Sequence, residues 1–208
     1  MENISEKFSD YILASGSPRG IEMMRRHGIQ PLVMPARIEE NLPSQHGMCE
    51  AVMFLALKKA KWVEDAFLRQ NDGKPSSAPV ILAADTIVYA DEIMGKPLDA
   101  DDGFRMLTRL RDGMHYVATG VALVEAGRQN ARVFTEITKV FFGHYTDEEL
   151  RAYLRTDEAY DKAGGYAIQG TFARYIDHIE GDYDNVVGFP WARIEKELGL
   201  LAAASPQR

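Results

Sequence analysis

The stretch that most constrains the fold runs from residue 80 to residue 97, VILAADTIVYADEIMGKP. An apolar run leads into Asp85 and Thr86, after which apolar residues resume. A carboxylate inside a β-prone run is costly to bury unless a cation or several donors replace its lost solvation. A turn-like Ala-Asp-Glu and a final Gly-Lys-Pro then predict a hairpin that presents one carboxylate, with Lys96 nearby. An aspartate that only caps or tightens a strand end is the alternative.

Length and charge limit the classes of partner. A chain of 208 residues is long enough for a sizeable core, as one large domain or two small lobes. Its 24 Lys and Arg against 31 Asp and Glu give a net charge of −7. Binding to a nucleic acid polymer depends on neutralising many phosphates, so we expect no such partner. A single triphosphate needs only a local basic pocket and stays possible.

The chain shows no sign of export or membrane insertion. Its N-terminus, MENISEKFSD, is polar and has no h-region. No apolar run approaches the roughly 18 residues of a membrane span. We therefore expect a cytoplasmic protein with no membrane partner. The single Cys49 rules out an intramolecular disulfide and fits a small core residue, with a nucleophile as the alternative.

The N-terminal segment predicts an anion site. A strand over residues 11–14 is followed by a loop with Ser15 and Ser17, and then by a helix to about His27. Ser17 is a good N-cap, and proline suits the first helical position. Free backbone N–H groups and the helix dipole at such a loop favour phosphate. Arg19 runs against the preference for acids in the first turn, which an anion at that end would explain; a side chain facing water is the alternative.

A second strand is expected over residues 31–35, followed by an acidic loop, 37–43, that carries Glu40. A long helix over about 47–68 has an apolar stripe at helical spacing. Lys59 lies on or beside this stripe. Lysines there usually extend along apolar surface to reach water, and a functional role is the other interpretation.

The rest of the chain alternates between regular elements and loops. We expect a polar loop at 70–79, a helix at 100–111 capped by Asp99, alternating strands at 114–125 and 131–142 in an antiparallel hairpin, a helix from the capping box at Thr146 to about Arg155, and a last helix from Pro190 to Leu198 before a frayed tail.

Of all parts of the chain, residues 156–190 look least like a hydrophobic core, because they are rich in Gly, Asp and Tyr. We place Gln169 on a short β-like segment, 166–170, where its amide can donate and accept hydrogen bonds and where Tyr166 could help to line a polar pocket. The glycines nearby allow close approach of a ligand, or only tight turns. Asp182, Asp184 and Asn185 form a second polar cluster.

Four stretches in order, LASGSPR, AADTIV with GKP, DKAGGYAIQG and GDYDNVVGFP, resemble the Maf family of nucleoside triphosphate pyrophosphatases. Together they span nearly the whole chain. The resemblance implies one α/β domain over residues 1–208, with residues 202–208 as a frayed tail. It also implies a mixed, strongly bent central sheet flanked by helices, and two lobes around a deep cleft, similar to the inosine-triphosphate pyrophosphatases.

The resemblance further implies hydrolysis of a nucleoside triphosphate between its α and β phosphates, with a divalent cation such as Mg²⁺ or Mn²⁺. The ADT and YAIQG forms resemble the subgroup that acts on dTTP and UTP. This predicts a housecleaning enzyme of the nucleotide pool. A nucleotide-binding regulator of septum formation and cell division, with little turnover, is the alternative. A homodimer is expected because the family commonly dimerises.

Roles carried over by motif follow the same resemblance. Asp85 looks like the catalytic residue, acting as general base on the attacking water or holding the metal. The residues that look like substrate contacts are Ser15, Ser17, Arg19, Glu40, Lys59, Thr86, Lys96 and Gln169. One departure is Gly20, which stands where the family's Ser-Pro-Arg-Arg loop has its second arginine.

The residues support part of this independently. A triphosphate carries roughly −4, so a site for it needs several cations and a metal to spread the charge that develops in transfer. A carboxylate such as Asp85 is the type of ligand that Mg²⁺ prefers. The five histidines lie outside the four motifs, and the chain has no P-loop sequence or G-x-S-x-G elbow. Histidine-based, P-loop and serine-nucleophile mechanisms are therefore not expected.

Overall fold

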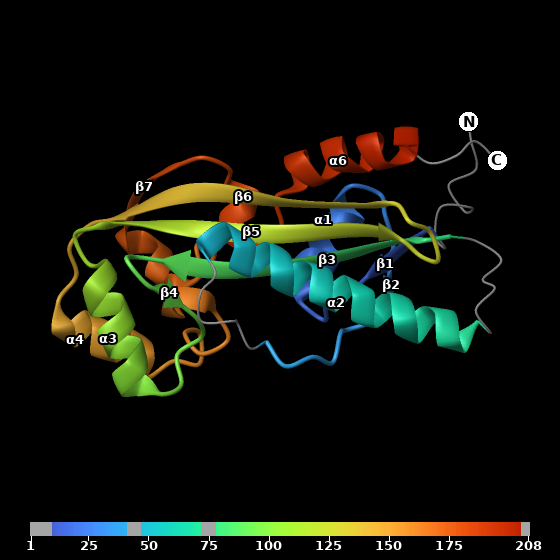
Figure 1. Ribbon diagram of the computed structural model, residues 1–208. Helices are drawn as coiled ribbons and strands as arrows, with labels where there is room; N and C mark the ends of the chain where they lie inside the picture. Colours follow the sequence, from blue (N-terminus) through green and yellow to red (C-terminus); the bar gives the residue numbers. More distant parts are fainter. Residues whose placement is uncertain (1–9, 41–46, 72–77, 205–208) are drawn as a thin grey trace. The chain divides into compact units, whose positions relative to one another are not determined.

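The computed structural model describes residues 10–40, 47–71 and 78–204, and its strands form a mixed sheet (Figure 1). The strand order is β2-β1-β3-β5-β6-β7, with β4 paired to β3. Strand β1 is parallel to β2 and β3, whereas the β3–β4 and β6–β7 pairs are antiparallel. The predicted α/β class with a mixed sheet flanked by helices is confirmed.

The elements have the following bounds. The strands are β1 Tyr11–Leu13, β2 Leu32–Val33, β3 Val80–Tyr89, β4 Ile93–Met94, β5 Met114–Glu125, β6 Ala131–Phe142 and β7 Ile176–Glu180. The helices are α1 Pro18–Arg26, α2 Met48–Gln70, α3 Ala100–Leu110, α4 Asp147–Leu154, α5 Tyr183–Val187 and α6 Trp191–Ala204, with 3₁₀ turns η2 Ala163–Gly165 and η3 Thr171–Tyr175. Parts of the predicted loops 37–43 and 70–79 lie outside the described residues.

The chain divides into two compact units. The first comprises Met1–Asp85, Gly120–Thr135 and Trp191–Arg208, and the second comprises Thr86–Thr119 and Glu136–Pro190. The chain passes from one unit to the other inside β3, β5 and β6, and again just before α6.

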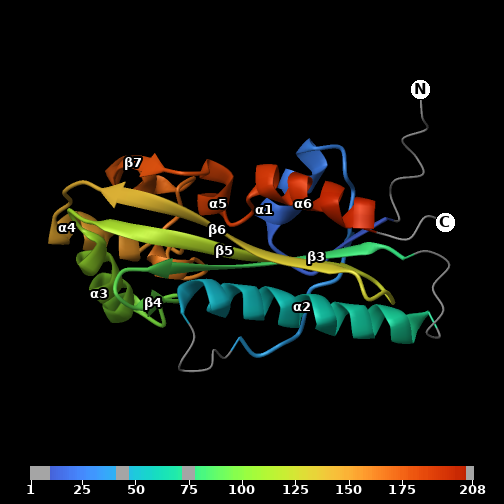
Figure 2. The ribbon, with the colours of Figure 1, turned by 45° about the horizontal axis from the view of Figure 1, so that its top comes forward.

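In the first unit, α2 packs on the strands through the stripe that the sequence predicts. Ala56, Ala60 and Val63 of α2 are fully buried against residues of β1, β3 and β5. Figure 2 shows α2 on one face of these strands and α1 and α6 on the other. The helix lies so close to β5 that a Cβ atom added at Gly120 would lie 2.3 Å from the backbone carbon and oxygen of Val52. Only glycine fits at that crossing.

The two predicted hairpins are confirmed. Strand β4 pairs antiparallel with β3, with Val88 opposite Met94. The N–H of Glu125 donates to the carbonyl of Asn130 across the turn between β5 and β6. The expected polar–apolar alternation of β5 is wrong, because every residue from 117 to 126 is buried. Strand β5 lies between β3 and β6, and a central strand buried on both faces reads as a nearly continuous apolar run.

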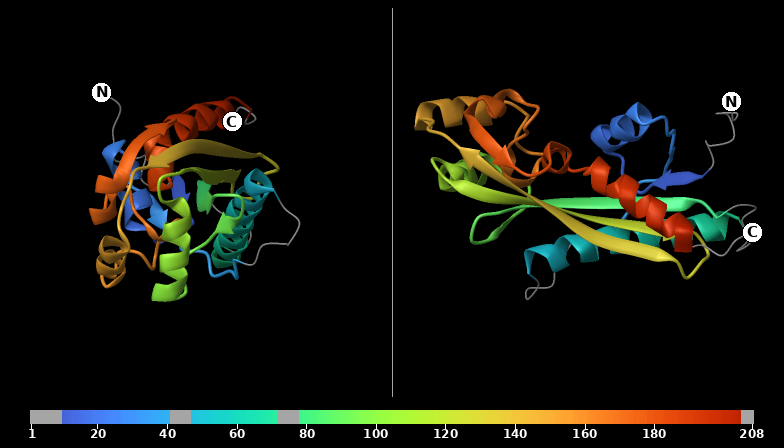
Figure 3. Two further views of the ribbon diagram at one scale, coloured as in Figure 1. Left: turned by 90° about the vertical axis from the view of Figure 1, so that its left-hand side faces the viewer. Right: turned by 90° about the horizontal axis from the view of Figure 1, so that it is seen from above.

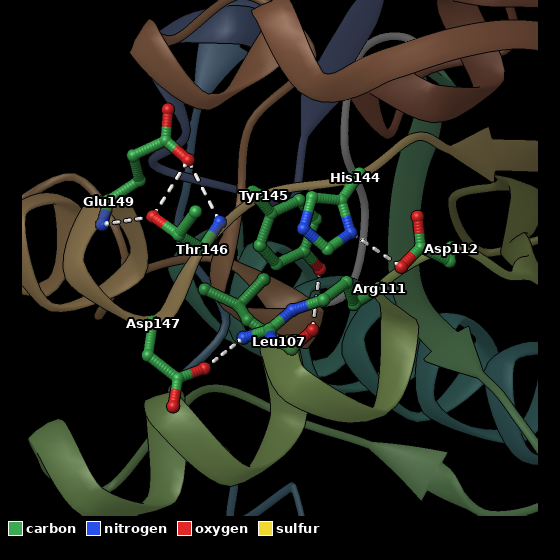
Figure 4. Close-up of polar contacts among 8 residues, drawn as sticks. All are labelled: Leu107, Arg111, Asp112, His144, Tyr145, Thr146, Asp147 and Glu149. Carbon is green, nitrogen blue, oxygen red and sulfur yellow. Dashed lines mark hydrogen bonds and ion pairs between the residues drawn. The ribbon is translucent and has the colours of Figure 1, made fainter.

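In the second unit, α3 and α4 lie side by side (Figures 1 and 3). Figure 4 shows how they are joined: the fully buried Tyr145 donates its hydroxyl proton to the carbonyl of Leu107 at 2.5 Å. Arg111 lies over the Tyr145 ring and donates to Asp147 at 2.6 Å. The predicted capping box is present, because Thr146 and Glu149 each accept from the other's backbone N–H. These contacts fix the start of α4 against the end of α3.

The irregular region from 156 to 190 contains more regular structure than expected. The predicted β-like segment 166–170 is wrong: it is a turn region between η2 and η3, since Gly164 and Gly165 adopt φ of +69° and +76° and turn the chain. Strand β7 and the short helix α5 were not predicted, because neither has a clear periodicity over five residues. Helix α6 continues to Ala204 rather than ending at Leu198, so the expected frayed tail is helical at 202–204, and residues 205–208 lie outside the described part.

A buried histidine anchors the loop that precedes Gln169. His115 and Tyr166 are buried, and the His115 Nε2 lies 2.6 Å from the Tyr166 hydroxyl. Burial lowers the pKa of His115 to about 3, so the imidazole is neutral near pH 7. Tyr166 therefore faces the core, and its expected place in the wall of a substrate pocket is wrong.

This histidine should make stability depend on pH. An unfolded histidine has a pKa of about 6.5 and the folded His115 a pKa of about 3, so only the unfolded chain gains a proton between these values. The stability contribution is complete above about pH 6.5 and is lost as the pH falls towards 3, by up to about 1.4 kcal/mol per pH unit. Urea denaturation between pH 7 and 4 should show a steeper loss for the wild type than for His115→Gln. The exposed His178→Gln is the control and should keep the wild-type slope; equal slopes for wild type and His115→Gln would contradict the prediction.

Candidate active site

The site of the first unit lies where its parallel strands end. Ile12 and Leu13 of β1 pair with Ile81 and Leu82 of β3, and Asp85 follows three residues after Leu82. The loop after β1 and the segment after β2 leave from the same edge of the sheet, since all three strands run in one direction. Ligands of open α/β sheets bind outside the carboxyl ends of parallel strands. The predicted loop contacts and Asp85 therefore lie at the edge where a ligand is expected.

Lys59 of α2 connects two carboxylates at this edge. Its Nζ lies 2.6 Å from Oδ1 of Asp85 and 2.7 Å from Oε1 of Glu40. The side chains of Lys59 and Asp85 are 14% and 9% exposed, whereas that of Glu40 is 49% exposed. The cation that the largely enclosed carboxylate of Asp85 requires is thus Lys59, and Lys59 does not extend to water as the alternative interpretation held.

The electrostatics of this cluster keep Lys59 charged. Burial by itself lowers the pKa of the ammonium group, but the charge of Asp85 and hydrogen bonds to Asp85 and Glu40 outweigh it and leave the pKa of Lys59 raised. The neighbouring Lys58 donates to the carbonyl of Glu39 at 2.8 Å, which fixes the segment that carries Glu40 against α2. A permanent cation is therefore held between two acids before any ligand binds.

The loop after β1 has the form expected of an anion site. The backbone N–H of Ser17 donates to Oγ of Ser15 at 3.1 Å, and Ser17 occupies the N-cap position of α1. The side chain of Ser17 makes no capping hydrogen bond, and the first turn of α1 contains no acid but does contain Arg19. The end of this helix thus presents free N–H groups and a cation, which suits phosphate.

Two other positions of the first unit, Gly20 and Cys49, bear on what the sequence suggested. Gly20, which stands where the family loop has its second arginine, is buried in α1. Cys49 is partly exposed near the start of α2 and is not the buried core residue that we expected, because it lies in the first turn, where only part of the helix faces the sheet.

Three predicted substrate contacts belong to the second unit. Thr86 is partly buried on β3, Lys96 is exposed just after β4, and Gln169 is exposed in the turn between η2 and η3. Their roles stay predictions. The structure adds Thr119, which sequence reasoning missed, and it joins Thr119 to Asn185 of the predicted polar cluster: both residues are fully buried, and the Thr119 hydroxyl contacts Thr86 and the carbonyl of Asn185. Thr119 lies in a nearly continuous apolar strand and gave no sequence signal of its own.

The carboxylates at this edge do not form a complete metal site by themselves among the described residues. Among the described residues, no group of three or more His, Cys, Asp or Glu side chains could hold a metal ion. Asp85 and Glu40 both contact the ammonium group of Lys59, and Mg²⁺ typically takes one or two carboxylates together with substrate phosphates and water. The two carboxylates are therefore of the type that a divalent cation takes, although Lys59 holds the point between them.

Comparison with known proteins decides the family. The family model for Maf-like proteins matches residues 10–203. The chain belongs to the Maf-like protein family. A Maf-like relative from Geobacter sp. (strain M21), named dTTP/UTP pyrophosphatase, is 44% identical over 95% of this chain and 98% of its own. One from Alkaliphilus oremlandii (strain OhILAs) with the same name is 40% identical over 86% and 89%.

Two further findings complete the description of this Maf-like chain. A solved HAM1 protein from Coxiella burnetii aligns with a TM-score of 0.48 and 12% identity, over 95% of this chain and 100% of its own. Among residues 10–40, 47–71 and 78–204, no helix is both long and apolar enough to cross a membrane.

Proposed function

We propose that the chain is a nucleoside triphosphate pyrophosphatase that converts dTTP or UTP to the monophosphate and pyrophosphate. The observation that supports this most is the Glu40–Lys59–Asp85 cluster at the carboxyl edge of the parallel strands, beside a helix N-terminus suited to phosphate. Relatives similar over nearly their whole length are named for this activity. Hydrolysis of these nucleotides would serve as housecleaning of the cytoplasmic nucleotide pool.

The residues of the first unit divide the work. Arg19 and the N–H groups at the start of α1 would bind phosphate oxygens, and Lys59 would share its charge between Asp85 and the triphosphate. Asp85 would accept the proton of the attacking water, a role that needs a carboxylate held in one orientation. The 2.6 Å contact with Lys59 supplies that orientation.

Asp85 and Glu40 are the residues that would hold Mg²⁺ or Mn²⁺. When bound, such a cation would draw negative charge away from the phosphate oxygens and so help the P–O bond between the α and β phosphates to break. Arg19 and Lys59 would not replace this effect, because they would neutralise only part of a charge of about −4, and Lys59 also balances Asp85.

The proposed reaction is tested directly by finding which phosphate bond the protein cleaves. With dTTP labelled at the α phosphate, the label should appear in the monophosphate while unlabelled pyrophosphate accumulates. Thin-layer chromatography of the products, with and without Mg²⁺, measures this. Labelled dTDP together with free orthophosphate would mean that the terminal phosphate is cleaved, and the proposal would fail.

The alternative of a septum-formation regulator with little turnover gains no support from the described residues, and the relatives carry the names of enzymes. A homodimer stays an expectation from the family resemblance. The regulator alternative is tested with dTTP and Mg²⁺, because a protein that only binds nucleotide releases no pyrophosphate.

A further inference from the structure

A buried polar network lies beneath Thr86 in the second unit. Its Oγ1 lies 2.9 Å from Oγ1 of Thr119, and the Thr119 hydroxyl donates to the backbone carbonyl of Asn185 at 3.2 Å. Thr119 and Asn185 are both fully buried. The network joins the residue after Asp85 to the GDYDNVVGFP motif, for which the proposed reaction gives no direct role.

The motif itself is fixed by hydrogen bonds to two strands, one to a backbone carbonyl of β5 and the others to a side chain of β6. The Asn185 amide donates to the carbonyl of Val117 at 3.0 Å and to Oγ1 of Thr138 at 3.1 Å. Thr138 also donates to the carbonyl of Asp182 and accepts from its N–H. The carbonyl of Asn185 therefore has a defined position under Thr119.

This arrangement determines which threonine donates. A hydroxyl has one proton and two acceptor lone pairs. The carbonyl of Asn185 can only accept, so the proton of Thr119 is used there. If Thr119 donated to Thr86 instead, its oxygen would face the carbonyl oxygen at 3.2 Å with no proton between them. In the 2.9 Å contact the donor is therefore Thr86.

The Thr86 hydroxyl therefore has a fixed hydrogen-bonding role. With its proton turned inward, the hydroxyl offers a ligand only acceptor lone pairs. Gly188 keeps the space beside it open, because a Cβ at this position would lie 3.0 Å from the Thr86 Oγ1. Phosphate oxygens are acceptors too, so they make poor partners for such a hydroxyl.

We propose that Thr119, held by Asn185, is a positioning residue that makes Thr86 a hydrogen-bond acceptor for an N–H or O–H donor of the nucleoside part of the substrate. This inference rests on the proposed function, since it takes Thr86 to contact the nucleotide. The donor is the imide N–H of a uracil or thymine ring, or a hydroxyl of the sugar. Thr119 itself touches no substrate.

The test measures binding without turnover. The probes are a uridine triphosphate analogue with a methylene bridge between its α and β phosphorus atoms, its N3-methyl form, which lacks the imide N–H, and its 2′,3′-dideoxy form, which lacks the sugar hydroxyls. Calorimetry gives the Kd of each for the wild type and for Thr119→Val, in which the Thr86 proton loses its inward acceptor. Thr119→Ser keeps the hydroxyl and is the conservative control.

For the unmodified analogue, Thr119→Val should raise Kd about two- to tenfold, the scale of one hydrogen bond, while Thr119→Ser restores wild-type binding. The effect should vanish for the one probe that lacks the donor, and which probe this is identifies the base or the sugar. An equal loss for all three probes, or no loss, overturns the proposal. Thr119→Ala serves if the valine variant does not fold.

Thr138→Val separates positioning from simple stability. It weakens the attachment of the GDYDNVVGFP motif but leaves the Thr119 hydroxyl in place, so it should lower Tm without selective weakening of any probe. A selective effect equal to that of Thr119→Val would contradict the role of Thr119. Because Kd is measured without turnover, a wild type that binds these probes but releases no pyrophosphate would count against the proposed function and not against this inference.

Discussion

Asp85→Asn should lower kcat by about a hundredfold or more, which is the scale of losing acid–base help. The amide has nearly the same shape but cannot accept a proton from water. Nucleotide binding should survive, because Lys59 keeps Glu40 as a partner at 2.7 Å and the anion site at α1 is unchanged. Steady-state release of pyrophosphate from dTTP, together with a separate measurement of nucleotide Kd, checks both parts.

The matched control is Asp65→Asn, which makes the same chemical change at an exposed position of α2. It should leave kcat and Kd within about twofold of the wild type, as surface changes away from a site usually do. Near-normal turnover of Asp85→Asn would place the chemistry at another residue. A large loss of binding in the same variant would instead make Asp85 mainly a ligand of the bound nucleotide and its cation.

Gly120→Ala should be the most destabilising single-methyl change in the first unit. The added Cβ would lie 2.3 Å from the backbone of Val52 and 2.5 Å from the nitrogen of Met53, so α2 must move away from β5. Backbone cannot rotate aside as a flexible side chain can, and we expect a loss of about 3 kcal/mol or more in the free energy of unfolding. Urea denaturation followed by circular dichroism measures it.

The same shift should reduce activity in the molecules that remain folded. Lys59 lies seven residues after Val52, two turns along α2, so moving the helix changes the distance between Lys59 and Asp85. Gly199→Ala is the control: nothing lies within 4 Å of the added atom, and alanine favours the α6 helix by up to about 1 kcal/mol. A Gly120→Ala protein as stable as the wild type would show that α2 and β5 are less tightly packed than described.

Local patterns predicted much of the fold. The hairpin around Asp85, the apolar stripe of α2 and the capping box at Thr146 are each set by residues close in sequence, and each is found where it was expected. Strand β7 and helix α5 were missed because tertiary contacts define them: Thr138 and Asn185, 47 positions apart, supply the hydrogen bond that fixes α5 to β6.

In the candidate site, too, features set by nearby residues could be predicted and features set by tertiary contacts could not. A buried acid could be inferred from the composition of residues 80–89, and the need for a cation followed from the cost of burying it. Helical spacing placed Lys59 beside the apolar stripe of α2, but its pairing with Asp85 could not be inferred, because the two residues are 26 positions apart and only the packing of α2 on β3 brings them together. The prediction for Tyr166 was wrong for a different reason. Its hydroxyl in a glycine-rich stretch suggested a polar pocket, whereas in the structure the hydroxyl is hydrogen bonded to the buried His115 in the core.

The path of the chain through the two units has a consequence for synthesis on the ribosome. The first unit begins with the N-terminal residues but includes α6, whose Trp191 stacks on His27 and whose Glu197 pairs with Arg132 of β6. Because domains fold as they emerge, N-terminal parts first, this unit stays incomplete until α6 has been made, and α6 follows the whole of the second unit in the chain. A nascent chain that stops before residue 191 leaves the surface that α6 covers exposed, so products truncated there should depend on chaperones and proteases far more than chains that include α6.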